Sequence, residues 1–574
     1  MILFYDFEVF KYDWLVCIKS GDSFEVIINN PKRLQDYYKS HINDVWVGYN
    51  SAHYDKFIMA DIINNERNPY PISFALVNNM VDTIGALRYT GNINLINFDV
   101  QGADKSKSLK QLELFMGDSI EESTVPFDID RPLSASELDE VVRYCKHDVN
   151  ETEQVFLKRI SYFKSHVNLI KTFNLPFAKS MGLTQARLSA EIIGCKSRRF
   201  KDEKECSLLD CIKIGKYQDV YDWFASGKHN EPVFTKTGKA KNASLEVMIF
   251  GIPHKCGLGG IHGCIPKPIK RDGNILHIDV RSYYPSIMIE HNLLTRSADN
   301  PAKYKAIFDN RIALKEAGKD EEQKPFKIVL NSTYGITKDP YSKAYDFRRG
   351  SEVCANGQLM LIDLLDKLEN AGCCELLQSN TDGIIIQYDN GTYDTIVAIC
   401  EEWCSRCAMV LEYEPIAKLI QKDVNNYIAV FEDGTVEVVG AMVKVNNALD
   451  NNCAIRNIAI RDYLINGKSV WATLITHNDL IDYQICVKRS SKYDRLWVGD
   501  TPTDLKTLRV FATTDGVSIG KQKGTGTIER YASTPEKATV YNGCVKNMKC
   551  KDLSIDKRWY YEKIMGDLKL WEVE

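Results

Sequence analysis

The chain has 574 residues, too many for one hydrophobic core, so several domains or subdomains are expected. Apolar residues make up 44% and charged residues 26% of it, as in ordinary globular proteins, and no apolar run is long enough to span a membrane. The net charge of −4 neither supports nor excludes nucleic-acid binding. Seventeen scattered cysteines, in a chain that starts without a signal-peptide pattern, predict reduced thiols and a cytoplasmic protein.

The first 160 or so residues alternate strand-like and helix-like segments, which predicts an α/β domain. Asp6 and Glu8 stand near the end of the first predicted strand, and Asp55 follows a second apolar segment and a polar turn. Carboxylates at strand ends suit divalent metals, although any one of them alone is more often an ordinary surface group.

A helix is predicted to begin near Ser134, which forms a capping-box pattern with Glu137. Tyr144 and Asp148 are four positions apart on this helix and therefore project from one face. Together with the three earlier carboxylates, this pair predicts a two-metal site for phosphodiester hydrolysis in which the tyrosine orients the attacking water.

A second carboxylate pattern lies in the middle of the chain. A short apolar strand over 275–278 leads into Asp279. About a hundred residues later, apolar runs over 376–379 and 384–386 flank a polar turn that contains Asp382, which predicts a hairpin. Two carboxylates at the tips of neighbouring strands can hold a pair of divalent cations.

Two helices are predicted between Pro301 and Gly335, joined by a turn over 316–320. Arg311 and Lys315 lie four apart on the first helix, and Lys327 lies on the second. Three cations converging on one cleft would suit a triphosphate, although the first two alone are more often surface charges.

These segments carry a family resemblance. Asp279–Ser286, Lys327–Gly335 and Ser379–Gly383 resemble motifs A, B and C of family B DNA polymerases, in the family's order. The carboxylates and tyrosine of the N-terminal segment resemble the exonuclease motifs of that family's proofreading domain. The resemblance implies a compact phage- or plasmid-type DNA polymerase with a 3′→5′ exonuclease and two Mg²⁺ ions per active site, for which Mn²⁺ could substitute.

The resemblance also implies roles for individual residues. The metal ligands and catalytic residues are Asp6, Glu8, Asp55, Asp148, Asp279, Val280 and Asp382, with Tyr144 catalytic. The incoming dNTP contacts Val280, Ser282, Tyr284, Arg311, Lys315, Lys327 and Asn331, and Tyr284 excludes a 2′-hydroxyl. DNA contacts are Asn50, Tyr54, Ser108, Leu109, Gly259, Gly260, Tyr334, Gly335, Thr381, Lys422 and Tyr427.

The expected fold class is α/β and α+β multidomain, with an RNase H-like exonuclease domain followed by a right-hand polymerase. The expected division is 1–165 exonuclease, 166–270 linking subdomain, 271–300 palm, 301–345 fingers, 346–450 palm and 451–574 thumb. Residues 557–561 are basic and aromatic, which suits either a grip on duplex DNA or a buried aromatic cluster.

Three positions depart from the family pattern. Asn380 replaces the first acid of motif C, Gly257 replaces the tyrosine of a Tyr-x-Gly-Gly element, and Asn425 replaces a lysine near Tyr427. We expect catalysis to survive, with Lys422 or Lys444 supplying the missing cation.

The intervals on either side of motif B are too short for the two insertions of protein-primed polymerases. The expected partners are therefore an ordinary primer–template, dNTPs and single-stranded 3′ ends, with the chain acting as a monomer away from membranes. Two alternatives stay open: an exonuclease with a decayed polymerase half, or a non-enzymatic template-binding replication protein. Cys404 with Cys407, and His254, Cys256, His262 and Cys264, are weak zinc candidates.

Overall fold

The computed structural model describes residues 1–102, 104, 106–234, 238 and 240–572. The chain forms two compact units, each of mixed α/β structure. Unit 1 comprises Met1–Thr184, Asn446–Ala459 and Lys468–Lys563, and unit 2 comprises Gln185–Val445, Ile460–Gly467 and Ile564–Glu574. Among the described residues, no helix combines the length and apolar character needed to cross a membrane.

Unit 1 is built on a five-stranded sheet of order β3-β2-β1-β4-β5. The β1, β4 and β5 strands are parallel, whereas β2 and β3 are antiparallel additions. The β1 sequence is apolar on both faces apart from two acids, as expected for a strand covered on both sides. The bounds are β1 (Ile2–Val9), β2 (Trp14–Ser20), β3 (Ser23–Ile28), β4 (Val45–Gly48) and β5 (Asn97–Asp99).

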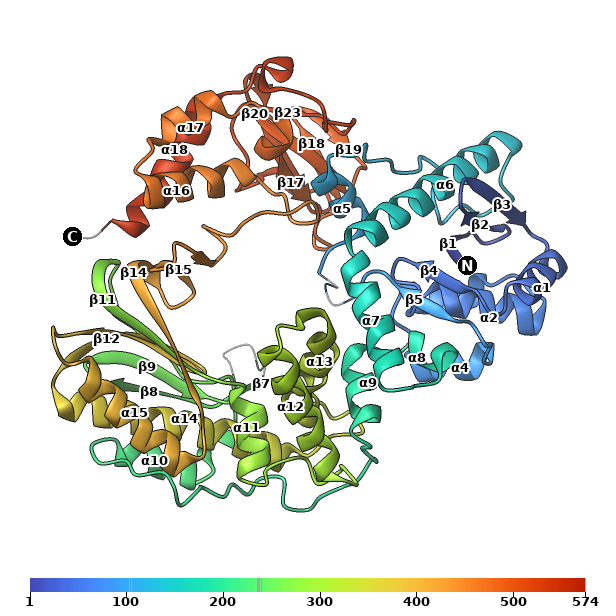
Figure 1. Cartoon of the computed structure of the whole chain (residues 1–574). Coiled ribbons are helices and arrows are strands. Elements are labelled where there is room, and N and C mark those ends of the chain that lie inside the picture. Colours follow the sequence, from blue (N-terminus) through green and yellow to red (C-terminus); the bar gives the residue numbers. More distant parts are fainter. Residues whose placement is uncertain (103, 105, 235–237, 239, 573–574) are drawn as a thin grey trace. The chain divides into compact units, whose positions relative to one another are not determined.

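The long helix α6 packs across β1 and β2, and α2 packs against β1 (Figure 1). The predicted capping box at Ser134 is present: its hydroxyl accepts from the Glu137 amide, and the Glu137 carboxylate accepts from the Ser134 amide. The helices of this segment are α1 (Pro31–Ser40), α2 (Asp55–Asn65), α3 (Tyr70–Val77), α4 (Thr83–Thr90), α5 (Leu109–Met116), α6 (Ala135–Lys158), α7 (Ile160–Thr172) and α8 (Phe177–Met181).

The later part of unit 1 contains a three-stranded sheet, β17-β20-β23, and a four-stranded sheet, β19-β18-β21-β22. Tyr560 is fully buried and donates to the Tyr483 carbonyl, so it belongs to the core, whereas Arg558 is exposed. The elements of this part of the chain are α16 (Ala454–Asn466), α17 (Val470–Thr476), η2 (Leu480–Tyr483), β17 (Ile485–Lys488), β18 (Arg495–Val498), β19 (Thr501–Thr503), β20 (Thr507–Val517), β21 (Ile519–Gln522), β22 (Glu529–Arg530), β23 (Ala538–Val540), η3 (Cys550–Leu553), α18 (Lys557–Leu568) and η4 (Lys569–Trp571). The parts of α16 and α18 from Ile460 and Ile564 onward, and all of η4, are assigned to unit 2.

Unit 2 is built on a nine-stranded sheet of order β16-β15-β14-β11-β13-β12-β10-β9-β8. The predicted hairpin is present as β12 and β13, and β11 lies between β13 and β14. The strands are β6 (Pro232–Phe234), β7 (Ala240–Asn242), β8 (Ser244–Ile249), β9 (Ile252–Gly257), β10 (His262–Cys264), β11 (Ile269–Val280), β12 (Cys374–Asn380), β13 (Gly383–Tyr388), β14 (Leu411–Asp423), β15 (Asn426–Phe431) and β16 (Val436–Val439).

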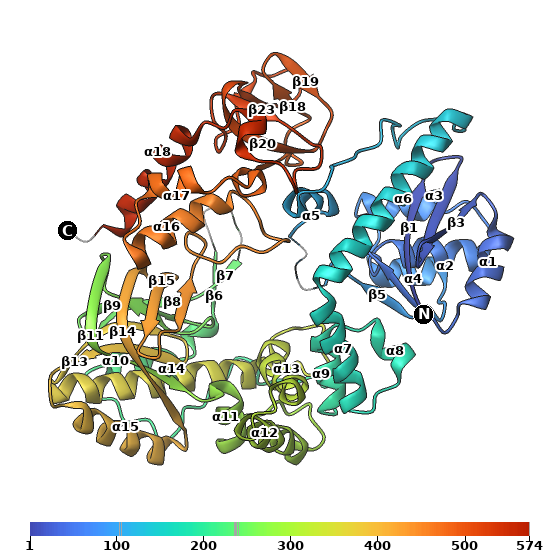
Figure 2. The ribbon, with the colours of Figure 1, turned by 45° about the horizontal axis from the view of Figure 1, so that its top comes forward.

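The buried helix α14 lies along this sheet with α15 beside it (Figure 2). The two predicted helices around residues 316–320 are present as α12 and α13, which pack against each other. Gly318 reverses the chain between them at φ 68°, a conformation that glycine adopts without strain. The helices are α9 (Gln185–Ile192), α10 (Gln218–Ala225), η1 (Lys228–Asn230), α11 (Tyr283–Glu290), α12 (Pro301–Glu316), α13 (Asp320–Thr337), α14 (Phe347–Ala371) and α15 (Tyr393–Cys407).

Candidate active sites

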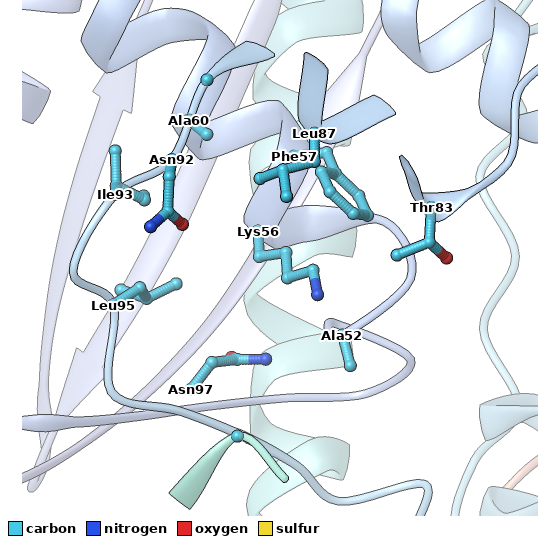
Figure 3. A pocket seen from close by; sticks show the side chains of 12 residues that line it. Ala52, Lys56, Phe57, Ala60, Thr83, Leu87, Asn92, Ile93, Leu95 and Asn97 are labelled. Atoms are coloured by element: carbon cyan, nitrogen blue, oxygen red, sulfur yellow. The ribbon is translucent and has the colours of Figure 1, made fainter. Parts of the chain in front are cut away.

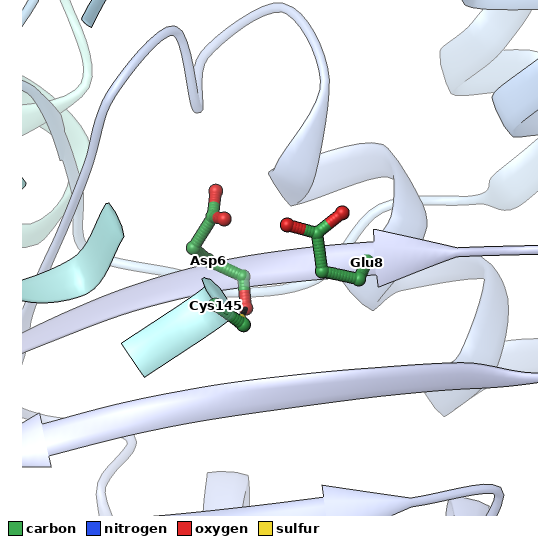
Figure 4. Close-up of side chains that lie close together, drawn as sticks. All are labelled: Asp6, Glu8 and Cys145. Carbon is green, nitrogen blue, oxygen red and sulfur yellow. Dashed lines mark hydrogen bonds between the residues drawn. The ribbon is translucent and has the colours of Figure 1, made fainter. Parts of the chain in front are cut away.

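Strand periodicity places Asp6 and Glu8 on one face of β1. Successive side chains of a strand alternate between its faces, so both acids share a face with Phe4. The Phe4 ring contacts Phe156 of α6, with ring centroids 5.3 Å apart. Figure 4 shows both carboxylates pointing to the same side of the strand, while the Cys145 thiol donates to the Asp6 backbone carbonyl.

Two further carboxylates join this pair from the neighbouring helices. Asp55 is the first residue of α2, and its Oδ1 accepts from the Phe7 amide at 3.3 Å. Asp148 lies on the α6 face that packs over β1, one turn after Tyr144. The structure therefore brings together all five residues that the sequence singled out for this site.

Crowding of negative charge shifts the pKa values of this group. Burial, followed by the charges of Asp55 and Glu8, raises the pKa of Asp6 well above its usual range. Burial and the Asp148 charge do the same to the pKa of Glu8. Burial raises the pKa of Asp55 to about 7 and that of Asp148 to about 6. Several oxygen ligands that repel one another are a suitable environment for hard divalent cations.

Sequence reasoning missed Lys110, on the first turn of α5. Its ammonium donates to Asp148 and, at 2.9 Å, to the buried Glu113, and it lies 4.7 Å from the centre of the Tyr144 ring. Glu113 also lies 3.5 Å from a ring nitrogen of His147. The adjoining Ser108–Leu109 pattern was the only sequence signal near this lysine.

The predicted DNA-contact residues of unit 1 lie in the loop before α2 and at the start of α5, next to residues that carry or contact the carboxylates. Asn50 has φ 60°, and its amide donates to Asp99, which also accepts from Ala52 and so fixes this loop. Ser108 caps α5, and Leu109 begins that helix. A pocket of about 460 Å³ opens beside Glu8 and is lined mainly by aromatic and apolar side chains, including Tyr54, Tyr70, Phe74 and Phe127.

In unit 2, the strand register brings Asp279 and Asp382 together. Asp279 pairs with Gly383 across β11 and β13, and the Val280 amide donates to the Asp382 carbonyl at 2.9 Å. Burial and the Asp382 charge raise the pKa of Asp279 to about 7, and burial raises the pKa of Asp382. Within the described part of the chain, neither carboxylate forms a salt bridge with a lysine or arginine. Their negative charge is therefore left for a cation.

Two non-glycine residues beside these carboxylates adopt left-handed backbone conformations. Ser282 has φ 51° directly before α11, and Thr381 has φ 58° in the hairpin turn. Such conformations cost about 1–3 kcal/mol and persist where the surroundings enforce them. Backbone strain is thus present close to both Asp279 and Asp382.

One pocket of about 230 Å³ gathers residues from all three central motifs. The Tyr284 ring packs on the Tyr334 ring, with centroids 4.3 Å apart and an interplanar angle of 37°. The Tyr283 hydroxyl donates to the Gly357 carbonyl, so the Tyr283 ring points into the protein. The lining comprises Ser282, Tyr283, Tyr284, Pro285, Leu330, Asn331, Tyr334 and Asp382.

The three predicted triphosphate-binding cations have different environments. Arg311 is buried and donates to the Ser282 hydroxyl, and Lys315 donates to Glu412 at 3.0 Å. Lys327 is exposed on α13, one turn before Asn331 on the same face, and forms no ion pair among the described residues. Of these three cations, Lys327 is therefore the one whose charge is available to a ligand.

The Gly259–Gly260 loop lies against the motif C turn. A Cβ on Gly260 would meet the Thr381 hydroxyl at 3.1 Å, whereas one on Gly259 would enter open space. The Ile261 carbonyl accepts from the Thr381 amide at 2.8 Å, and the loop's Leu258 carbonyl accepts from Lys338 at 3.0 Å. This loop therefore joins motif C to the end of α13, close to Tyr334 and Gly335.

The positions that depart from the family pattern have local partners. Asn380 Oδ1 lies 2.9 Å from Nδ1 of His262. The Asn425 amide donates to Asp423, which also binds Lys422, while Tyr427 is buried and its hydroxyl reaches Glu437 at 3.5 Å.

In the weak zinc candidate around His254, the ring nitrogens of this histidine have other partners. One of its ring nitrogens lies 2.9 Å from the Ile252 carbonyl and the other 2.7 Å from the Ser379 hydroxyl. Both nitrogens are thus engaged within the sheet.

Comparison with known proteins gives matches among solved structures and none elsewhere. No family model matches the chain, and no curated protein matches it. Among solved structures, the chain is similar to the family B DNA polymerase from the hyperthermophilic archaeon Pyrobaculum calidifontis, at 16% identity and a TM-score of 0.41. The match covers 100% of this chain and 78% of that one. At these values the likeness carries no argument about function, which rests on the two sites themselves.

Proposed function

We propose that the chain is a DNA-templated DNA polymerase of family B type, with a 3′→5′ exonuclease in unit 1 and polymerisation in unit 2. One observation carries the proposal: residues about a hundred positions apart, including Tyr284, Asn331 and Asp382, line one pocket beside Asp279. A nucleotidyl transfer site needs these parts together, namely metal-binding carboxylates and a shaped space for the nucleotide.

The donor sets fit Mg²⁺ at both sites. Each offers carboxylate oxygens with raised pKa values, and magnesium prefers such hard ligands. Asp279 and Asp382, with the Val280 carbonyl, would hold the ions of unit 2. Asp6, Glu8, Asp55 and Asp148 would hold those of unit 1. When bound, the ions activate the attacking oxygen and stabilise the charge on the phosphate.

In unit 2, the protein's own groups orient the nucleotide. The Tyr284 ring packs on Tyr334 and would present an aromatic surface to the deoxyribose, where it would clash with a 2′-hydroxyl. Lys327 is free to meet phosphate oxygens, and Asn331 lies on the same helical face. Arg311 fixes Ser282 rather than reaching the pocket, so its contribution is positional.

In unit 1, the group is arranged to cleave a phosphodiester. Tyr144 would orient the attacking water, and its own hydroxyl stays protonated because burial and nearby carboxylates raise its pKa. The aromatic pocket beside Glu8 has the shape and chemistry to receive a terminal nucleobase. Asn50, Ser108 and Leu109 would contact the single strand that leads to it.

The remaining assignments follow from this function. The substrates are an annealed primer–template, dNTPs and single-stranded 3′ ends, and a phage or plasmid replication system would use such an enzyme. Gly259, Gly260, Gly335, Thr381, Lys422 and Tyr427 would contact DNA. The right-hand division into palm, fingers and thumb over 271–574 is part of the same proposal.

The test is primer extension by the purified chain with Mg²⁺, dNTPs and an annealed oligonucleotide carrying a free 3′-hydroxyl. Template-directed extension supports the proposal. Degradation without extension would favour an exonuclease with a decayed polymerase half, and binding without either reaction would favour a replication scaffold.

A further inference from the structure

A second pocket of unit 1, outside the carboxylate group, is built to receive a ligand. It has a volume of about 230 Å³ and lies between α2, α4 and the segment that leads into β5 (Figure 3). This is below the roughly 300–1,000 Å³ of pockets for drug-sized molecules, so its ligand is small. The lining comprises Ala52, Lys56, Phe57, Ala60, Thr83, Leu87, Gly91, Asn92, Ile93, Leu95, Asn97 and Gly182.

Asn97 points an amide group into this pocket although its side chain is buried. The residue is 5% exposed, and its Oδ1 already accepts from the Tyr5 hydroxyl at 2.9 Å and the Ser51 hydroxyl at 3.1 Å. Both contacts hold the oxygen away from the pocket, so the amide nitrogen faces into it. No described residue accepts from that nitrogen, so it can donate to a group that occupies the pocket.

Lys56 supplies a positive charge to the same space. Figure 3 shows its ammonium pointing into the pocket, 4.7 Å from the centre of the Phe57 ring. It is the one ionisable side chain among the twelve lining residues, and no carboxylate lies among them. The donors therefore favour an anion.

The other walls are apolar. Ala60, Leu87, Ile93 and Leu95 line the space around the two donors. A bare inorganic ion would leave these walls uncovered, whereas an anion carried on an apolar or flat body would contact both parts.

We infer that this pocket binds a small organic oxyanion, a phosphate or carboxylate on a flat or apolar body, with Lys56 and Asn97 holding the anion. One source is a nucleoside 5′-monophosphate, the product of the proposed exonuclease, and this source rests on the proposed function. Lys56 directly follows Asp55, so an occupied pocket would adjoin the start of α2 that carries this catalytic carboxylate.

The test is calorimetric titration of the full chain with two anions, dAMP and benzoate, against their neutral counterparts deoxyadenosine and benzamide. EDTA and an Asp6→Ala/Glu8→Ala background keep metal-dependent binding at the carboxylate site out of the signal. Lys56→Met should weaken binding of the anion about tenfold or more, the scale of one charge-assisted hydrogen bond. Lys39→Met, at an exposed α1 lysine outside the pocket, should leave binding unchanged.

A second variant guards against indirect effects of the lost charge. Ala60→Leu places extra atoms in the pocket from a buried position of α2 and should also abolish binding, with an unchanged circular dichroism spectrum. Benzoate binding that depends on Lys56 supports the inference even if the chain neither extends nor degrades DNA. Absence of saturable binding by both anions, or equal affinity in the parent, Lys56→Met and Ala60→Leu, would overturn it.

Discussion

The carboxylate group of unit 1 is more deeply buried than that of unit 2. Glu8, Asp55 and Asp148 are each less than a tenth exposed, whereas Asp279 is half-buried and Asp382 is exposed at the hairpin turn that lines the Tyr284 pocket. A buried group of carboxylates suits attack by water on the 3′ end of one nucleic-acid strand. An open pair with aromatic walls suits a nucleotide and a primer end together. The comparison predicts two reactions that can be removed separately.

The largest effect is expected at the unit 2 carboxylates. Asp279→Ala or Asp382→Ala should lower nucleotide incorporation at least about 10²–10³-fold, because charge stabilisation at the phosphate is lost. Degradation of a single-stranded 3′ end should continue, since the carboxylates proposed for that reaction lie in the other unit. Incorporation at the parent rate in both variants would remove these residues from the active site.

The converse change, at the carboxylates of unit 1, should remove degradation and leave extension. Asp6→Ala combined with Glu8→Ala should lower 3′-end degradation by a similar factor and raise misincorporation, while extension continues. The measurement is release of mononucleotides from a labelled single strand. Tyr144→Phe serves as a milder comparison because it removes a water contact and no metal ligand. Equal release by the double variant and the parent would contradict the assignment.

The pocket beside Asp279 predicts an intermediate effect on sugar selectivity. Tyr284→Ala should relax discrimination against ribonucleotides by about 10–200-fold. This is the factor by which a packed pocket discriminates between substrates that differ by one small group. The control is Tyr341→Ala, at a tyrosine of unit 2 that is 90% exposed. Parallel single-nucleotide incorporation with dNTP and rNTP measures the ratio, and an unchanged ratio would take Tyr284 out of the sugar contact.

Burial in unit 1 predicts a pH-dependent gain in stability for Asp55→Asn without metal. The pKa of Asp55, raised to about 7, lies above the unfolded value of about 3.9, so its favourable contribution is complete below pH 4 and lost as the pH rises through 7. In EDTA, the melting temperature of the variant relative to the parent should increase by a few degrees between about pH 5 and pH 8. At the higher pH, Mg²⁺ should instead give the parent the higher melting temperature of the two. A difference that is independent of pH would contradict the buried-carboxylate account.

The smallest effect is expected at Asn380. Asn380→Asp keeps the acceptor that faces His262 and adds one carboxylate beside Asp382, so extension should change less than about threefold. Asn380→Ala removes the acceptor and should be the more damaging of the two. Steady-state incorporation rates decide the order, and an inactive Asn380→Asp enzyme would indicate a different metal arrangement.

Local sequence signals predicted much of this architecture. The Ser134 capping box, the turn around Asp382 and the two helices on either side of Gly318 all follow from short-range patterns, and the structure has each of them. The four-residue spacing of Tyr144 and Asp148 also placed both on one helical face.

Contacts between distant segments escaped such reasoning. Lys110 reaches Asp148 from another helix, and Lys315 is committed to Glu412 on β14 rather than to a shared cationic cleft. Asn97 faces a pocket only because Tyr5 and Ser51 occupy its oxygen. These partners meet through tertiary packing, which no local spacing encodes.

The most direct measurement places both reactions on one substrate, a primer–template with a labelled primer 5′ end. With Mg²⁺, the parent should shorten the primer without dNTPs and extend it to the template end with them. Asp279→Ala should only shorten it, and Asp6→Ala/Glu8→Ala should only extend it. Loss of both reactions in each variant, or extension that persists in Asp279→Ala, would contradict the claim that the two units carry separate metal-dependent sites.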